Sequence, residues 1–229
     1  MGEIIRIVPA GDAAVLIELG DAIDPQINRR VHSLADLLMQ SPPRGIGEAV
    51  PAYASLLLHY DPAVLDYAEA IHWVEAQVSQ VGLAQTPEPR LVELPTLYGG
   101  EHGPDLSFVA QAHGLTEEQV IRLHSSATYT VYMMGFTPGF GYLGGLPESL
   151  ATPRLEKPRT RIRAGSVGIA GSQTGVYPID SPGGWRIIGF TPLRLFDPLR
   201  QPPTLLSAGD RVRFIPITPQ ELDNVTAGE

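Results

Sequence analysis

Glycine spacing in the second half of the chain restricts its fold more than any other feature. Twelve of the 24 glycines lie between Gly135 and Gly189, interspersed with Val, Ile, Tyr, Phe and Pro. Glycine adopts the positive φ angles that tight turns need, while β-branched and aromatic residues favour strands. This stretch therefore predicts short strands joined by tight turns, in a compact β-barrel or sandwich.

The part of the chain before residue 82 shows a different pattern, in which strand-like and helix-like segments alternate. Helices are predicted for residues 24–40 and 62–81. Each begins at an Asp-Pro pair, because Asp caps a helix and Pro suits its first position. Strands are expected at residues 3–8, 13–19 and 55–59, with another near Ala49. This organisation indicates a small α+β sandwich.

A domain boundary is predicted at residues 82–89, which contain two prolines and no hydrophobic periodicity. We expect an α+β domain at residues 1–85 and a β-barrel domain at residues 90–220. The second domain should also contain a strand at 91–95, a helix at 104–113, a helix from Thr116 and a closing strand at 212–217. Thr116 and Gln119 fit a capping box. The residues after the closing strand are expected to form a loose tail.

Composition limits the cellular setting and the chemistry. The chain has no cysteine, which excludes disulfides, a thiolate nucleophile and Cys-based zinc sites and fits a reducing compartment. Acidic residues interrupt the apolar N-terminal stretch, and no apolar run approaches the ~18 residues of a membrane span. We therefore expect a cytoplasmic protein. The net charge of -9, with few interleaved aromatic residues, argues against nucleic-acid binding.

Positive charge is concentrated in residues 154–213, which hold ten of the 16 Lys and Arg residues but four of the 25 acids. In an extended segment, Arg159 and Arg161 would project from one side, because alternate side chains share a face. We predict that these two arginines bind an anion: a substrate carboxylate, a nucleotide phosphate or an acidic partner surface. The alternative is an exposed edge strand whose positive charge blocks strand pairing.

Several common catalytic and nucleotide-binding motifs are absent or out of context. The GxGxxG match at residues 139–144 is followed by Gly-Leu-Pro and not by a helix that could hold a pyrophosphate. No GxxxxGK[ST] loop exists. Ser166 narrowly misses a GxSxG nucleophile elbow and lies in a glycine-rich β region. The six histidines show no metal-binding spacing, so no metal site is expected.

A long series of motifs resembles one protein family, the B subunits of 5-oxoprolinase, also described as allophanate hydrolase subunit 1 or KipI-like. The resemblance covers nearly the whole chain to about residue 217. Its segments are SLLLHYDP at 55–62, YGGEHGPDL at 98–106, HSSATY at 124–129, GFTPGF at 135–140, YLGGL at 142–146, GSVGIAGSQTGVYPIDSPGGWRIIG at 165–189 and PLRLFDP at 192–198. Gly141, Arg163 and Phe190 depart from the residues usual in the family.

The resemblance implies a ferredoxin-like α+β N-terminal domain followed by a cyclophilin-like β-barrel. It also implies an activity in which the B subunit pairs with a C subunit. Together with an A subunit, they open 5-oxoproline to glutamate at the expense of ATP. ATP would be bound by the complex. On its own, the B subunit is not expected to be a catalyst.

Individual site residues follow from position and residue type. His124 lies near the end of a predicted helix, where it would contact substrate and transfer a proton, or be held as an imidazolium by the helix dipole. Gln173, Thr174 and Tyr177 flank a glycine turn and would offer an amide, a hydroxyl and a phenol to a small polar substrate. Hairpin hydrogen bonding is the alternative for these three. Trp185 is expected in the barrel core.

Two other functions remain open beside a role in 5-oxoprolinase. One is a KipI-type inhibitor of a sensor histidine kinase, and the other is a component of a urea amidolyase or allophanate hydrolase. A plain prolyl isomerase is a weaker possibility, since a barrel fold does not imply that chemistry.

Overall fold

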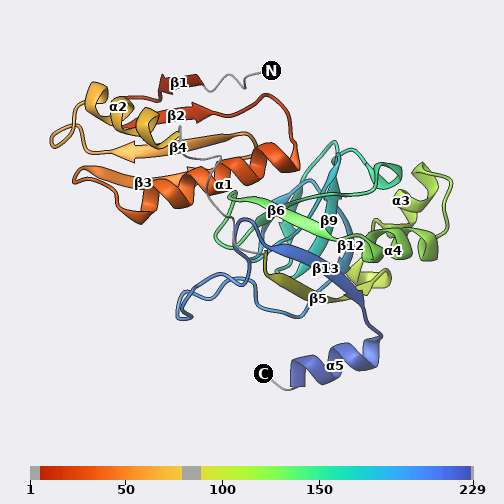
Figure 1. Ribbon diagram of the computed structural model, residues 1–229. Coiled ribbons are helices and arrows are strands. Elements are labelled where there is room, and N and C mark those ends of the chain that lie inside the picture. The colour runs from red at the N-terminus through yellow and green to blue at the C-terminus, as the bar shows by residue number, and fades with distance from the viewer. Residues whose placement is uncertain (1–5, 79–88, 228–229) are drawn as a thin grey trace. The chain divides into compact units, whose positions relative to one another are not determined.

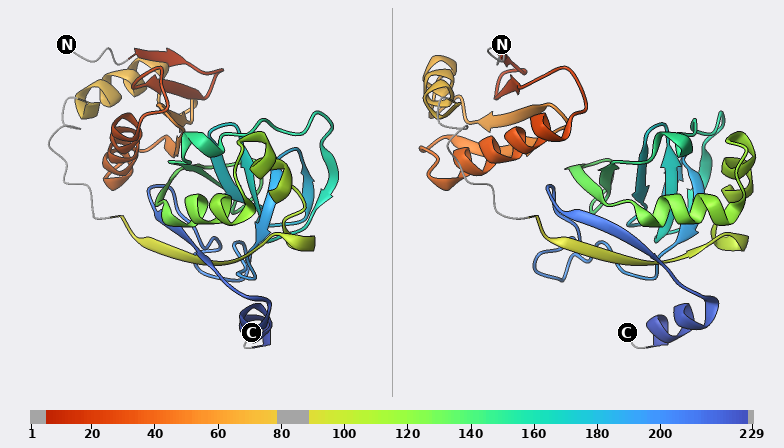
Figure 2. Two further views of the ribbon diagram at one scale, coloured as in Figure 1. Left: turned by 90° about the vertical axis from the view of Figure 1, so that its right-hand side faces the viewer. Right: turned by 45° about the vertical axis from the view of Figure 1, so that its right-hand side comes forward.

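The chain forms two compact units, residues 1–88 and 89–229, in a computed structural model that describes residues 6–78 and 89–227. Figures 1 and 2 draw the backbone of the two units. Each unit contains its own hydrophobic core. The α+β class expected from the sequence is confirmed. Of the predicted linker at residues 82–89, all but Pro89 lies outside the described residues.

The first unit is a four-stranded antiparallel sheet with two helices packed against one face (Figure 2). The sheet order is β1-β2-β4-β3. Alternate residues of the central strands, such as Val15 and Leu56, pack against Leu34 and Val74 of the helices. The elements are β1 (Arg6–Pro9), β2 (Ala14–Glu18), α1 (Pro25–Gln40), β3 (Ile46–Pro51), β4 (Ser55–Tyr60) and α2 (Tyr67–Val78).

Helix α1 begins where the sequence predicts. The side chain of Asp24 accepts hydrogen bonds from the backbone N–H groups of Gln26 at 2.7 Å and Ile27 at 3.1 Å. Pro25 occupies the first helical position, where its missing N–H costs nothing.

The predicted start of α2 at Asp61 is wrong. Asp61 accepts a hydrogen bond from the N–H of Ala63 at 2.9 Å and closes only a local turn. The helix begins at Tyr67, after Asp66 and Glu69 have each accepted a 2.9 Å hydrogen bond from the other's backbone N–H. This reciprocal pair satisfies two backbone N–H groups at the start of the helix, whereas the Asp61 side chain satisfies one. The helix therefore begins after Asp66 and not at the Asp-Pro pair.

The ferredoxin-like assignment of the first unit is not confirmed. Its described elements run in the order ββαββα, whereas a ferredoxin-like domain runs βαββαβ. Strand β1 forms an antiparallel hairpin with β2 at the edge of the sheet.

The second unit contains the predicted β-barrel, which is closed by seven strands in the order β10-β7-β6-β13-β5-β12-β9. Among the described pairings in the barrel, only that between β5 and β13 is parallel. Strands β8 and β11 form a separate two-stranded sheet. The likeness of the barrel to cyclophilin stays a prediction. The strands are β5 (Leu91–Tyr98), β6 (Tyr129–Met134), β7 (Gly141–Gly144), β8 (Arg159–Ile162), β9 (Ser166–Ala170), β10 (Gln173–Val176), β11 (Ser181–Gly183), β12 (Arg186–Phe190) and β13 (Arg211–Pro216).

The second unit also contains short helices: η2 (Gly100–His102), α3 (Leu106–Ala112), α4 (Glu117–Ser126), η3 (Glu148–Leu150) and α5 (Pro219–Ala227). The capping box of α4 is confirmed, because the Thr116 hydroxyl accepts from the Gln119 N–H at 3.2 Å and the Gln119 side chain accepts from the Thr116 N–H at 2.8 Å.

The prediction of a loose C-terminal tail is wrong, since helix α5 occupies that stretch (Figure 1). Glu221 accepts from the N–H of Thr218 at 2.7 Å, and the Thr218 hydroxyl accepts from the N–H of Glu221 at 3.3 Å. The TPQE sequence is therefore a second Thr-x-x-Glu capping box that starts a helix.

Within the described ranges, no helix is both long and apolar enough to span a membrane.

We predict that residues 1–85 and 90–229 each fold when expressed separately, because each unit has a core of its own. Limited proteolysis of the whole chain should cleave within residues 82–90, ahead of β5. Circular dichroism and amide exchange of the two fragments would check this. Two unfolded fragments, or cleavage inside β5, would contradict it.

Candidate functional site

The residues predicted to form the site lie in three separate places within the second unit. His124 and Thr174 belong to a buried hydrogen-bonded network. Arg159 and Arg161 line one pocket, and Tyr177 lines another. Gln173 starts β10 opposite Ala170 and is half-buried.

His124 connects helix α4 to the wall of the barrel. It is completely buried, and its Nδ1 lies 2.8 Å from the hydroxyl of Tyr98, at the end of β5. Its Nε2 lies 2.9 Å from the Thr174 hydroxyl on β10. The backbone carbonyl of His124 also accepts a 2.7 Å hydrogen bond from the Tyr129 hydroxyl. Both ring nitrogens are thus occupied within the protein.

The hydrogen-bond pattern assigns the tautomer of His124. The Thr174 hydroxyl donates its one proton to the Gly168 carbonyl at 2.9 Å, so it accepts from an Nε2–H of His124. Nδ1 then accepts from the Tyr98 hydroxyl. Burial lowers the pKa of His124 to about 3 and raises that of Tyr98. The alternative of an imidazolium held by the helix dipole is therefore wrong, because the loss of solvation outweighs the helix dipole.

We name the first pocket the arginine pocket and define it by Glu101, His102, Arg159, Arg161, Arg163 and Phe190. Its volume is about 260 Å³. Arg159, Arg161 and Arg163 all line it. Phe190 lines this pocket and packs against His102 with ring centroids 5.2 Å apart.

Arg159 already has a carboxylate partner in the protein. Its two terminal nitrogens lie 2.8 and 2.9 Å from the two carboxylate oxygens of Asp105, just before α3. Asp105 is buried and also accepts a 2.7 Å hydrogen bond from the N–H of Ile187. The bidentate pair raises the pKa of Arg159. Its main visible role is to join β8 and β12 to the start of α3.

The other two arginines of the pocket are more exposed. Arg161 binds Asp180 through Nε at 2.8 Å and through a terminal nitrogen at 2.6 Å, with 79% of its side chain exposed. The Ala164 N–H and Arg161 lower the pKa of Asp180. The Arg163 guanidinium lies 4.5 Å from the ring centroid of Phe190, a cation–π contact.

We name the second pocket the aromatic pocket and define it by Phe136, Phe140, Tyr142, Arg154, Tyr177 and Trp185. It has a volume of about 200 Å³, and Pro158, Pro182, Gly183 and Gly184 complete its lining. Phe140 contacts the rings of Phe136, Tyr142, Tyr177 and Trp185 edge-on, with centroids 5.0 to 5.5 Å apart. Burial raises the pKa of Tyr177, and the N–H of Trp185 and Arg154 partly offset the effect.

Two linked turns in the GFTPGF segment place Phe136 at the aromatic pocket. The Thr137 N–H donates to the Gly135 carbonyl at 2.7 Å, and Phe136 has a φ of 64°. These features describe the rarer, strained form of γ-turn. The Phe140 N–H then donates to the Thr137 carbonyl at 3.0 Å, with Gly139 at a φ of 85°. That arrangement, with Pro at the second position, is typical of a type II turn.

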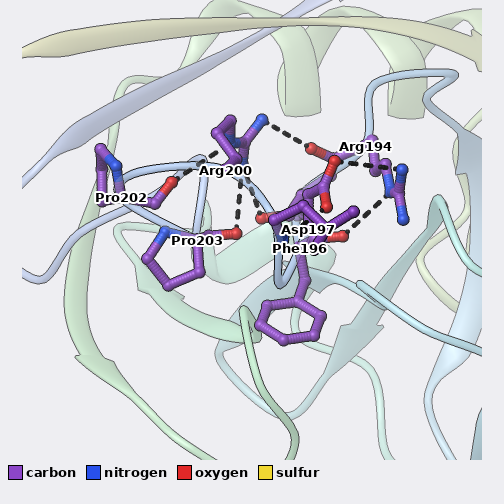
Figure 3. Close-up of polar contacts among 8 residues, drawn as sticks. Arg194, Phe196, Asp197, Arg200, Pro202 and Pro203 are labelled. Carbon is purple, nitrogen blue, oxygen red and sulfur yellow. Dashed lines mark hydrogen bonds and ion pairs between the residues drawn. The ribbon is translucent and has the colours of Figure 1, made fainter.

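Figure 3 shows a loop that is fastened by Arg200. This loop contacts the second of the two turns at Gly139. The Arg200 guanidinium donates to the carbonyls of Arg194, Leu195, Pro202 and Pro203 at 3.3 to 3.4 Å. A Cβ at Gly139 would lie 2.9 Å from the Cβ of Phe196 in this loop, so only glycine permits the close approach. The loop thereby braces the turn that carries Phe136.

Sequence reasoning missed Asp105 and Phe136 as site residues. Both lie inside quoted family motifs, but neither shows periodicity or charge clustering that distinguishes it. Within residues 6–78 and 89–227, no three His, Asp or Glu side chains come together as metal ligands.

We predict that Arg159→Ala lowers the free energy of unfolding by about 3 kcal/mol, because it leaves the Asp105 carboxylate buried without its cation. Arg161→Ala should cost at most about 1 kcal/mol, since its ion pair is exposed to solvent. Urea denaturation at neutral pH would compare them. Equal losses in the two variants would contradict the assignment.

A pH series should reveal the buried, neutral His124. The unfolded chain binds a proton at His124 below about pH 6.5, whereas the folded chain does not until about pH 3. Stability should therefore be lost as the pH falls through this window, by up to about 1.4 kcal/mol per pH unit from this group. His124→Gln should lack that component of the slope. Parallel pH curves of unfolding free energy in the two proteins would refute the assignment.

Comparison with known proteins identifies the relatives of this chain. Residues 5–206 match the family model described as "Carboxyltransferase domain, subdomain C and D". The chain is 44% identical over 226 residues to the B subunit of 5-oxoprolinase from Bacillus subtilis, covering 94% of each chain. It is 46% identical to the protein of the same name from Escherichia coli O157:H7, covering 90% of this chain and 93% of that one.

Solved structures agree with this grouping. The crystal structure of TTHA0988 is 40% identical with a TM-score of 0.80, and the match covers 94% of this chain but only 40% of that one. PH0987 from Pyrococcus horikoshii, a conserved uncharacterised protein, is 51% identical with a TM-score of 0.57, over 95% of this chain and 100% of that one. The chain belongs to the carboxyltransferase subdomain C and D family and, within it, to the B subunits of 5-oxoprolinase.

Proposed function

We propose that the chain is the B component of a cytoplasmic, ATP-dependent 5-oxoprolinase that opens 5-oxoproline to glutamate, pairing with the C subunit of that enzyme and acting with its A subunit. The observation that carries this proposal is the set of curated relatives named as B subunits of 5-oxoprolinase, which are 44–46% identical over 90–94% of this chain. Such relatives support a role as one component of an assembly.

The chemistry explains why several components and ATP are needed. A lactam is a resonance-stabilised amide that water opens slowly. Transfer of the γ-phosphoryl group of ATP to the lactam oxygen, with loss of the N–H proton, produces an activated imidate and ADP. Water adds to its carbon, and the adduct opens by cleavage of the ring C–N bond to an acyl phosphate and a free amine. A second water then hydrolyses the acyl phosphate to the carboxylate of glutamate and phosphate. The sequence contains no Walker loop for the nucleotide. We therefore propose that ATP is bound by the complex.

The anion-binding role predicted for Arg159 and Arg161 is part of this proposal, and their ion pairs distinguish the two residues. Arg159 directs both terminal nitrogens to Asp105. Arg161 is held by the exposed Asp180, and Arg163 stacks on an aromatic ring. An acidic surface on a partner protein can compete with Asp180 far more readily than with Asp105. Arg161 is therefore better placed than Arg159 to bind an external anion.

The remaining predicted contacts differ in how well their positions suit a role in binding. Tyr177 lines the aromatic pocket, which supports its assignment to substrate binding. Thr174 is buried against His124, and neither lines one of the two named pockets. The catalytic role of His124 and the substrate contacts of Gln173 and Thr174 stay predictions.

The alternative functions receive less support. The urea amidolyase of Lachancea kluyveri is 28% identical over 95% of this chain, and the match spans only 14% of that protein. This is well below the identity to the 5-oxoprolinase relatives. A KipI-type kinase inhibitor remains an alternative that the family resemblance implies.

Reconstitution tests the proposed function. We expect the purified chain alone to show no ATP-dependent formation of glutamate from 5-oxoproline, and activity to appear when the A and C subunits from the same genome are added. Glutamate and phosphate release are measured together. Activity of the isolated chain that the partners do not change would contradict the proposal, as would an inactive complex of all three folded subunits.

A further inference from the structure

The aromatic pocket holds a cation without a carboxylate partner. Arg154 lines the pocket, is exposed, and forms no ion pair with any acid in the described residues. None of the described residues that line the pocket is acidic. Arg159 and Arg161 in the neighbouring pocket, by contrast, each have an aspartate. An anion bound in the aromatic pocket therefore needs to displace no internal partner.

The walls of the same pocket suit a small ring. Phe136 and Tyr142 offer partly or largely exposed aromatic surface, and the buried rings of Phe140, Tyr177 and Trp185 complete the aromatic lining. The volume of about 200 Å³ is below the roughly 300–1,000 Å³ of clefts for drug-sized ligands. Ring methylene groups gain dispersion contacts and lose contact with water when they pack on such faces. The pocket thus matches a compact ring that carries one negative group.

Phe136 gives independent support for a binding role. Its side chain is 60% exposed although it is a large apolar residue. It also sits at a φ of 64°, in the strained γ-turn described above. A non-glycine residue in this region costs stability and persists where its surroundings enforce it, which occurs often at ligand sites. Burial of the ring against a ligand would recover contacts that the free protein lacks.

The close packing behind the pocket fixes its shape. A Cβ at Gly183 would lie 2.3 Å from the Tyr177 hydroxyl, and one at Gly175 would lie 3.1 Å from both Phe140 and Trp185. Glycine at these positions lets the aromatic rings pack directly on the backbone. The rings are therefore held in place before any ligand arrives, which reduces the entropy cost of binding.

We propose that the aromatic pocket binds a small cyclic carboxylate, with the ring methylenes against Phe136 and Trp185 and the carboxylate on Arg154. This inference rests on the proposed function for one point, that the cyclic carboxylate is 5-oxoproline. The binding role of the pocket is inferred from the Arg154 cation without a carboxylate partner, the aromatic walls and the strained turn at Phe136.

Trp185 supplies a direct readout of binding. The chain has two tryptophans, Trp73 in the first unit and Trp185 in the pocket wall, so Trp73→Phe leaves a single reporter. Fluorescence titration of this full-length protein uses three probes: 5-oxoproline, cyclopentanecarboxylate without the lactam, and 2-pyrrolidinone without the carboxylate. Equilibrium dialysis with labelled 5-oxoproline repeats the measurement on the assembled complex.

Arg154→Ala should weaken binding of both carboxylates at least tenfold, because it removes a charge-assisted contact, and should leave the weak binding of 2-pyrrolidinone unchanged. Phe136→Gly should weaken all three probes without lowering the stability of the protein, since glycine relieves the strained φ angle. Two matched controls should bind like the parent protein: Arg122→Ala, an exposed arginine on α4, and Phe108→Ala, a half-exposed phenylalanine packed under Arg186.

The outcomes separate this inference from the proposed function. One outcome is that cyclopentanecarboxylate binds in a manner that depends on Arg154, while the complex does not hydrolyse 5-oxoproline. This result supports the aromatic pocket as a carboxylate site and rejects the oxoprolinase assignment. Another outcome is that the complex hydrolyses 5-oxoproline and that Arg154→Ala does not change the KM. This result rejects the aromatic pocket as the substrate site and retains the oxoprolinase assignment. No saturable binding in either the chain or the complex overturns the inference. So does preferential binding of an uncharged proline peptide that is insensitive to Arg154.

Discussion

The ion pair between Asp105 and Arg159 joins parts of the second unit that are far apart in sequence. Asp105 precedes α3, Arg159 starts β8, and the same carboxylate accepts the N–H of Ile187 in β12. Each carboxylate oxygen receives a hydrogen bond from the guanidinium, and the backbone of Asp105 also donates to the Ile187 carbonyl at 2.8 Å. A buried carboxylate is tolerated only when it is matched this fully. The position of β8, which lies outside the barrel, depends on this contact.

Because β8 and its partner β11 contribute to both named pockets, their placement determines the chemistry of each. Arg159 and Ile162 of β8 line the arginine pocket, while Pro182 and Gly183 of β11 line the aromatic pocket. The two pockets differ in how their charge is satisfied. The arginine pocket carries its own counterions in Asp105 and Asp180, and the aromatic pocket does not. The number of positive charges in the sequence therefore overstated the capacity of the arginine pocket to bind an external anion. It gave no reason to single out the aromatic pocket.

Local signals in the sequence predicted much of the secondary structure, whereas contacts between distant residues could not be predicted. Thr116 and Asp24 begin helices as expected, because capping depends on residues within one turn. Arg159 meets Asp105 54 positions away, and Arg161 meets Asp180 19 positions away. No periodic pattern in the sequence indicates that residues at these separations come into contact. The sequence left two roles open for His124, a substrate contact and a charged residue at the helix end, because it shows the position of His124 on the helix but not its complete burial.

The parallel pairing of β5 with β13 has a consequence for how the protein is made. These are the first and last strands of the barrel, and an ion pair beside them joins Arg90 to Asp210, 120 positions later. The ring cannot close until the ribosome has added Pro216, the end of β13. At roughly 5–20 residues per second, the strands synthesised first wait on the order of ten seconds for their last neighbour. During this interval β5 exposes an unpaired edge to other nascent chains, a known route to aggregation. The first unit, whose described strands all precede residue 61, is under no such delay.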